Sequence, residues 1–217
     1  MHEYLQIFLH LDKVLEQAAA GLGPGPLYAL LFAIIFCETG LVVTPFLPGD
    51  SLLFAVGALI ATGKIPLSLA VVLPLLFVAG VVGDALNYAI GRKVGPAVFN
   101  RESSWLFDKK NLVRAQAFYE RYGGKAIVLA RFVPIVRTFA PFVAGIGKMQ
   151  YRRFAMFNVV GAGLWIVLLT LAGHTFGELP FVKRHFELIV IGIVLLSVLP
   201  AAVEVLRERA RSRRAAA

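Results

Sequence analysis

The segment from Cys37 to Asp50 constrains the fold most, because it places polar and helix-breaking residues inside apolar sequence. It contains two carboxylates, two prolines and two glycines, and the apolar runs 27–36 and 52–60 flank it. Irregular backbone at membrane depth persists only where protein shields it or where it lines a cavity. Acidic side chains at that depth are costly and are candidates for function. The segment therefore predicts a buried partner elsewhere in the chain.

The composition indicates an integral membrane protein of the all-α class. Of 217 residues, 59% are hydrophobic and 16% are charged, and the mean hydropathy is +0.77. Soluble domains have about a quarter of their residues charged. The net charge of +9 comes from basic residues that cluster in loops and at the C-terminus, with no nucleic-acid-binding motif. We therefore expect no nucleic-acid partner.

The hydropathy pattern divides the chain into three parts. Residues 1–25 predict an amphipathic interfacial helix, 26–206 a transmembrane domain and 207–217 a basic tail. Within the domain, the stretches 66–90, 154–172 and 187–205 are long enough to cross a bilayer. The stretches 27–61 and 126–147 each consist of two short apolar runs around a break, which predicts two re-entrant helical hairpins. A single broken span is the alternative for 27–61. Between the hairpins, 109–122 predicts a basic amphipathic helix.

The second predicted hairpin repeats the first with the opposite charge. Its break contains Arg131, Pro134, Arg137 and Pro141 where the first contains acidic residues. Phe-Ala-Val-Gly follows Asp50 at 54–57, and Phe-Val-Ala-Gly follows Arg137 at 142–145. We interpret this similarity as a weak internal repeat.

The lysines and arginines predict the topology. With three spans and two re-entrant hairpins, residues 92–125, 148–153 and the C-terminal tail lie on one side and hold eight, three and five basic residues. The opposite side holds four. By the positive-inside rule the C-terminus is cytoplasmic. The two hairpins then enter from opposite faces, in the manner of inverted-repeat transporters.

This topology brings acidic and basic hairpin tips together. Glu38 and Asp50 are predicted to pair with Arg131 and Arg137, because an arginine at the bilayer centre costs roughly 2.5–3.5 kcal/mol on insertion scales. The alternative is that these four residues only hold the hairpins in register. A further acid, Asp84, lies in a row of residues with Gly80 and Tyr88. Asp84 and Tyr88 either line a substrate path or pack helices together.

Three motifs in this order resemble the DedA family, also called SNARE-associated or VTT-domain membrane proteins. They are Glu38 with Pro45 to Asp50; Gly83 to Arg92; and Arg131 to Thr138 with Ala144 and Gly145. The similarity covers about residues 26 to 175. It implies paired re-entrant hairpins and lipid translocation, namely recycling of undecaprenyl phosphate across the bacterial inner membrane with dependence on the proton gradient, or movement of phospholipids. It also implies that Glu38, Asp50, Arg131 and Arg137 are the essential charged positions. The motif residues Pro45, Pro48, Pro134 and Thr138 are assigned to the path or to packing.

We therefore expect a lipid transporter in the inner membrane whose partner is a lipid phosphate head group, with proton coupling through a carboxylate. A proton-coupled transporter of a small solute or ion is the alternative. An enzyme is not expected, because none of the four histidines lies in a motif with a serine nucleophile and basic phosphate ligands. We also expect no cofactor and no metal, since the chain lacks a P-loop and metal-ligand spacing.

Overall fold

The structure of the protein is a computed structural model that describes residues 15–17, 21, 23–41, 49–98, 123–185, 188–189 and 192–193. Within these ranges the chain forms helices and no strands, which confirms the all-α class. Nearly all of the predicted N-terminal helix and third span lie outside them, as do helix 109–122, the tail, Pro45 and Pro48. In chain order the helices are α3 (Pro24–Gly40), α4 (Gly49–Ala61), α5 (Leu69–Val98), α7 (Lys125–Ala130), α8 (Pro134–Ile146), α9 (Tyr151–Phe176) and α10 (Pro180–Arg184).

Among the residues that the structure describes, two helices, α5 and α9, are long enough to cross a membrane. They contain 30 and 26 residues, or about 45 Å and 39 Å of helix, against a hydrocarbon thickness of about 30 Å. Their candidate spans, Leu69–Val94 and Tyr151–Phe176, have mean hydropathies of 2.3 and 2.1, and only 33% and 39% of the most apolar window is buried. The core helix of a soluble protein would be mostly buried. Two of the three predicted spans, 66–90 and 154–172, are thus confirmed as apolar membrane-span candidates.

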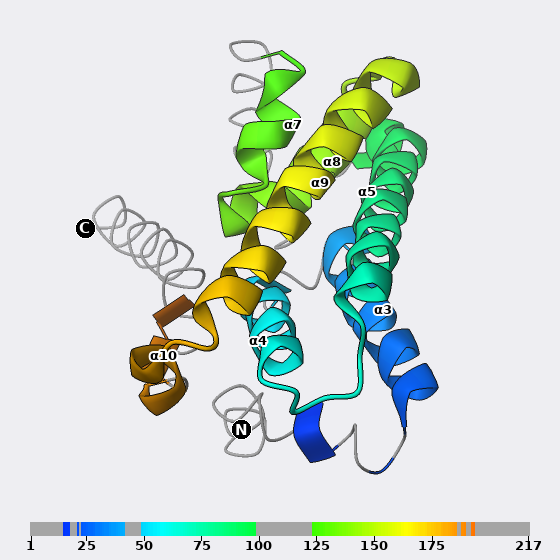
Figure 1. Ribbon diagram of the computed structural model, residues 1–217. Helices are drawn as coiled ribbons and strands as arrows, with labels where there is room; N and C mark the ends of the chain where they lie inside the picture. Colours follow the sequence, from blue (N-terminus) through cyan, green and yellow to red (C-terminus); the bar gives the residue numbers. More distant parts are fainter. Residues whose placement is uncertain are drawn as a thin grey trace, which may run out of the picture.

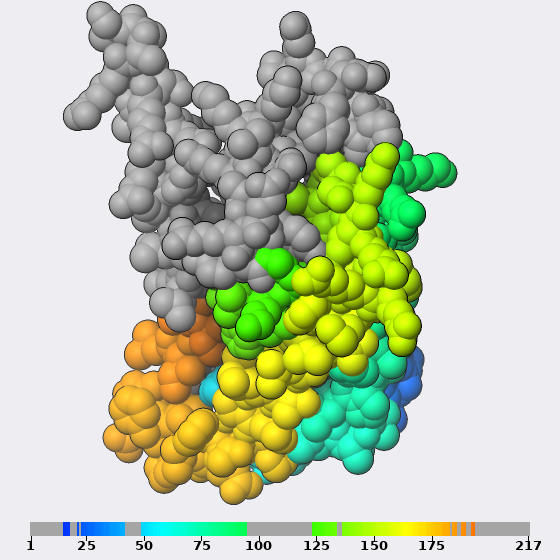
Figure 2. Space-filling model, turned by 90° about the horizontal axis from the view of Figure 1, so that it is seen from above, coloured from blue at the N-terminus to red at the C-terminus, as the bar shows by residue number. Residues whose placement is uncertain are grey.

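The polarity of α9 is the reverse of that of a soluble surface helix. Its buried side includes Asn158, Gly161 and Thr170, which are polar or small. Its exposed side is apolar, and Figure 2 shows α9 at the molecular surface beside α5. Lipid tails are the solvent that suits such a surface. The exposed apolar residues of α9 include Met156, Val159, Val160, Leu164, Val167, Leu168 and Leu171.

The helices α3 and α4 form the first helix pair and lie against one half of α5 and α9. Near the start of α3, the Tyr28 hydroxyl accepts a hydrogen bond from the N–H of Ser68, the residue before α5. Near the end of α3, Asn87 Nδ2 of α5 donates to the Thr39 carbonyl. These contacts show that α3 and α5 run in parallel. In Figure 1 the outer ends of α3 and α4 lie at the bottom, where α5 begins.

The helices α7 and α8 form the second helix pair, in the upper half of Figure 1. The break between them is only three residues long, from Arg131 to Val133. Pro134 occupies the first turn of α8, where its missing N–H costs nothing, and it keeps Val133 extended. The structure therefore corrects the predicted break, because Arg137 and Pro141 lie within α8.

Glycines mediate the same close contact in both halves of the molecule. A Cβ atom at Gly173 of α9 would collide with the backbone of Phe54 in α4, and one at Gly91 of α5 would collide with the backbone of Phe142 in α8. Phe54 and Phe142 are equivalent in the predicted internal repeat. The second helix of each pair therefore packs closely on a long helix, as small residues allow in a membrane.

Within the described ranges, the apolar interior consists of two clusters separated by polar residues. One cluster joins α3, α4, the first half of α5 and the middle of α9, and it reaches Ala79 along α5. The other includes Tyr88, Ile127 and Phe154. Between Ala79 and Tyr88 lie the buried polar residues Asp84 and Asn87. These residues bring α5 into the candidate site.

We expect Gly91→Ala and Gly173→Ala each to lower the melting temperature of the purified protein. Overpacking costs about 1–3 kcal/mol and outweighs the gain of about 1 kcal/mol in helix propensity from glycine to alanine. Thermal unfolding in detergent measures the effect. Gly163→Ala is the control, because its nearest neighbour is the Phe77 side chain at 3.6 Å. An equal shift in all three variants would contradict the close packing at Gly91 and Gly173.

Candidate functional site

Arg137 joins three helices through two carboxylates. It lies in the first turn of α8, and only 5% of its side chain is exposed. Its Nη2 atom is 2.8 Å from Glu38 Oε1, and its Nη1 atom is 2.5 Å from Asp50 Oδ1. Glu38 belongs to the last turn of α3 and Asp50 to the first turn of α4. Arg137 therefore ties both helices of the first pair to the second pair.

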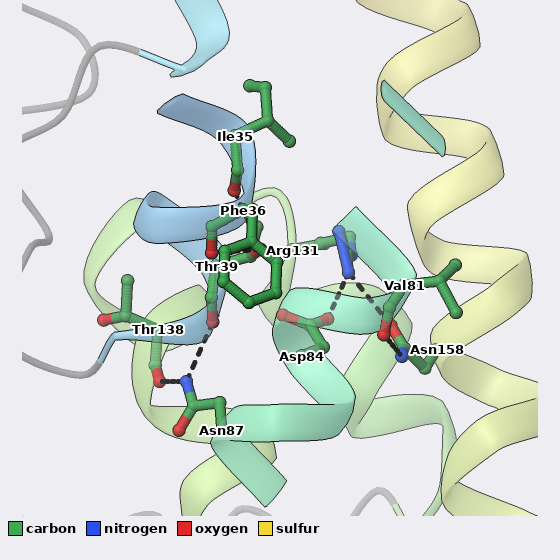
Figure 3. A network of polar contacts seen from close by, with 9 residues as sticks. All are labelled: Ile35, Phe36, Thr39, Val81, Asp84, Asn87, Arg131, Thr138 and Asn158. Carbon is green, nitrogen blue, oxygen red and sulfur yellow. Dashed lines mark hydrogen bonds and ion pairs between the residues drawn. The ribbon is translucent and has the colours of Figure 1, made fainter. Parts of the chain in front are cut away.

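Arg131 is held by a different set of residues. It follows the last residue of α7, is 2% exposed and donates from Nη2 to Asp84 Oδ2 and to Asn158 Oδ1, the latter at 3.0 Å. Figure 3 shows Asp84 on α5 and Asn158 on α9 converging on this guanidinium. Asn158 is oriented by its Nδ2 atom, which donates to the Val81 carbonyl at 3.0 Å. Arg131 therefore lies between the two long helices.

Trp165 of α9 contacts both arginines. The guanidinium carbon of Arg137 is 4.7 Å from the ring centre, and that of Arg131 is 5.4 Å. Both distances are within the range of cation–π attraction. The indole N–H donates to Asp50 Oδ1 at 2.7 Å, so Asp50 accepts hydrogen bonds from Trp165 and Arg137. Trp165 thus links the two arginine groups.

Asn87 of α5 joins the ends of two short helices. Its Nδ2 atom donates to the carbonyl of Thr39 in α3 at 3.0 Å and to the carbonyl of Thr138 in α8 at 2.8 Å (Figure 3). Buried carbonyls near a helix break need such donors. Asn87 therefore holds the end of α3 and the start of α8 beside the middle of α5.

Glycines surround the charged side chains. A Cβ atom at Gly49, the first residue of α4, would collide with the Glu38 carboxylate. At Gly80 a Cβ atom would lie 3.6 Å from Arg131 Nη1, and at Gly161 it would lie 3.7 Å from Arg131 Nε. The backbones of α4, α5 and α9 therefore approach the charges directly.

The cluster contains three carboxylates and two guanidiniums, all of them largely buried. Removing one partner from a buried ion pair leaves a desolvated charge and costs about 3–5 kcal/mol. The pairs therefore depend on one another. Among the described residues, no group of three histidine, cysteine, aspartate or glutamate side chains is arranged to hold a metal ion.

The structure brings all four predicted tip residues into one cluster but corrects their pairing. Glu38 and Asp50 both pair with Arg137, whereas Asp84 pairs with Arg131. The sequence analysis left open whether Asp84 lines a substrate path or packs helices together. Asp84 reaches Arg131 because α5 passes between the two helix pairs.

Tyr88 lies outside the cluster. Its hydroxyl donates to the Met149 carbonyl, and its ring stacks on Phe154 with the centroids 4.5 Å apart. These contacts support the packing alternative for Tyr88. Pro134 starts α8, and Thr138 contributes its carbonyl to the Asn87 bridge.

Sequence reasoning assigned no role to Asn158 or Trp165. A signal was available for Asn158, because its polar amide lies within a largely apolar span. Polar groups inside a membrane segment face the protein interior and mark functional positions. Their partners are distant in sequence, however: Trp165 is 115 residues from Asp50, and Asn158 is 77 from Val81.

Comparison with known proteins identifies the family. The VTT domain model matches residues 47–175, more than half of the chain. Protein DedA of Escherichia coli (strain K12) is 50% identical over 212 residues, which cover 98% of this chain and 96% of that protein. An uncharacterized membrane protein of Mycobacterium tuberculosis is 43% identical over 197 residues, covering 91% and 86% of the two chains. Inner membrane protein YghB of Escherichia coli (strain K12) is 36% identical over 178 residues, covering 81% and 78%.

No solved structure matches the chain. The matched domain includes Asp50, Asp84, Arg131 and Arg137, and the alignment with Protein DedA covers almost the whole sequence, within which Glu38 lies. The chain therefore belongs to the DedA family of VTT-domain membrane proteins.

Proposed function

We propose that this protein carries a lipid phosphate, either undecaprenyl phosphate or a phospholipid, across the bacterial inner membrane. The observation that supports the proposal is the burial of two arginines at one place in an apolar helical protein. Asp84 is within about 4 Å of the midpoint of the span Leu69–Val94, and Trp165 is within about 2 Å of the midpoint of Tyr151–Phe176, at 1.5 Å per residue. The arginines that they contact thus lie near mid-depth, where an anionic head group meets its highest barrier.

We propose that the two helix pairs re-enter from opposite faces of the membrane. The helices α3, α4 and α8 contain 17, 13 and 13 residues, so each is at most about 26 Å long and too short to cross alone. Their breaks meet α5 and α9 near mid-depth, where the protein shields irregular backbone from lipid. The matching glycine contacts of α4 and α8 support an inverted repeat. With the basic loops inside, the first pair enters from the periplasm and the second from the cytoplasm.

The arginines supply the chemistry that a phosphate needs. A guanidinium is a planar group of N–H donors that suits phosphate oxygens. Phe132 and Val133, which follow Arg131 directly, are 51% and 43% exposed. The lipid enters laterally at this turn, so that its chain stays in the bilayer while its phosphate reaches an arginine.

The carboxylates neutralise the arginines when no lipid is bound. A lipid phosphate competes with them for the same N–H donors. Protonation of one carboxylate weakens its hold on an arginine and thereby couples lipid transport to protons. Carboxylates of the cluster on α3, α4 and α5 are available for this step.

We expect the double variant Arg131→Ala and Arg137→Ala to lose lipid transport by at least about tenfold, since the phosphate loses its charge-assisted hydrogen bonds. The measurement is transbilayer movement of fluorescent undecaprenyl phosphate and of a fluorescent phospholipid in proteoliposomes. Arg152→Ala is the matched control, because Arg152 is exposed outside the cluster. Equal elution volumes from a sizing column establish that the variants are folded. Transport that persists in the folded double variant would disprove the proposal.

We expect a pH gradient that is acidic on the lipid-loading side to raise the initial transport rate, because protonation of a carboxylate releases an arginine. A protonophore should remove the increase. Vesicles containing a water-soluble anionic tracer provide the comparison with a small-solute carrier. Movement of the tracer with no movement of lipid would assign the protein to the solute class, and a rate independent of the gradient would reject proton coupling.

A further inference from the structure

The two buried arginines differ in how fully their donors are used. Arg137 gives one terminal nitrogen to each of two carboxylates. Arg131 directs both of its hydrogen bonds from the single atom Nη2, toward Asp84 and Asn158. Its Nε and Nη1 atoms are buried and have no hydrogen-bond partner among the described residues, whereas in Arg137 only Nε lacks one. A buried unpaired donor carries a desolvation cost of about 1–3 kcal/mol.

Two of the helix positions beside these donors are glycines, which have no side chain that could accept a hydrogen bond. Gly80 and Gly161 face Nη1 and Nε respectively, so neither α5 nor α9 provides a side-chain oxygen at these positions. On the chain itself, Phe132 follows Arg131 and is 51% exposed. The backbone of Arg131 therefore adjoins a surface-exposed turn, while its side chain is only 2% exposed.

The charges also distinguish the two arginines. An anion that approaches Arg137 meets the negative charges of Glu38 and Asp50, which both lie within 2.8 Å of its nitrogens. An anion that approaches Arg131 meets one carboxylate in direct contact, that of Asp84, the neutral amide of Asn158, and the more distant charge of Glu38. Because repulsion grows with each nearby like charge, Arg131 is the better anion site.

We propose that Arg131 is the phosphate-binding arginine, that Asp84 and Asn158 are positioning residues which hold it between transport events, and that Arg137 is a fixed clamp for the first helix pair. This inference rests on the proposed function and deepens it by assigning unequal roles to the two arginines. The ligand is a phosphate monoester or diester, which accepts hydrogen bonds from Nη1 and Nε of Arg131. Asp84 competes with the phosphate, so its charge sets the affinity of the site.

Trp165 provides the readout, because its ring contacts both guanidiniums. The chain has two tryptophans, and the full-length Trp105→Phe variant leaves Trp165 as the single indole fluorophore. In dodecyl maltoside, this variant is titrated with monododecyl phosphate and separately with inorganic phosphate. The change in Trp165 fluorescence gives a Kd for each probe.

We expect Asp84→Asn to lower the Kd for monododecyl phosphate by about tenfold, because the competing charge is removed while the shape of the side chain is kept. The matched control is Asp50→Asn, the same change beside Arg137, which should lower the Kd by less than about threefold because Glu38 still holds that arginine. Asn158→Asp adds a second carboxylate at Arg131 and should raise the Kd by about tenfold. This opposite shift provides the test if Asp84→Asn does not fold.

The outcomes separate the inference from the proposed function. Equal or greater tightening in Asp50→Asn, or weaker binding in Asp84→Asn, overturns the unequal roles even where the wild-type protein transports lipid. If the Kd values shift as predicted but the protein moves no lipid in vesicles, the Arg131 site is supported and the proposed function is overturned. If inorganic phosphate binds as tightly as monododecyl phosphate, the Arg131 site is supported, the proposed lipid transport is overturned, and the site is assigned to a soluble ion. A wild-type protein that binds neither probe overturns both.

Discussion

The structure depends on the cost of burying charge away from water. Five ionisable side chains lie in the interior of an apolar helical protein, and each is tolerated because an opposite charge or a hydrogen-bond partner lies beside it. Since these partners come from six helices or helix ends, the charges can be satisfied only when both helix pairs and both long helices are assembled. The same contacts that permit burial therefore specify the arrangement of the fold.

This requirement explains why small and amide residues accompany the charges. Glycines let the α5 and α9 backbones approach Arg131 closely, and Asn87 supplies donors to a carbonyl in the last turn of α3 and to one in the first half of α8. Glycine and asparagine carry no charge, yet they allow charged side chains and interrupted helices to be buried within the membrane. Charge burial and packing thus share one set of positions, with Asn158 and Trp165 contributing to both.

The unequal use of the two arginines suggests how such a site works. In the arrangement that we propose, Arg137, paired with two carboxylates, keeps the helix pairs together, while Arg131, with two unused donors, remains available to an anion. Separating the two tasks lets a head group enter without loss of the contacts that hold the fold. A carrier built on a single arginine would lose its central ion pairs each time it bound its substrate.

The sequence by itself determined the membrane class, the two long apolar helices, the two interrupted segments and the residues that carry charge within them, because hydropathy and helix-breaking residues act locally. It did not determine which acid pairs with which arginine. Glu38 is 99 residues from Arg137, and Asp84 is 47 residues from Arg131, so their pairing follows from how α5 and α9 pass between the helix pairs. The break after α7 was also shorter than predicted, because tertiary contacts keep Arg137 and Pro141 helical. Only the tertiary structure decided these points. The cost of removing a charged side chain from water is offset by whichever oppositely charged partner the packing brings within reach.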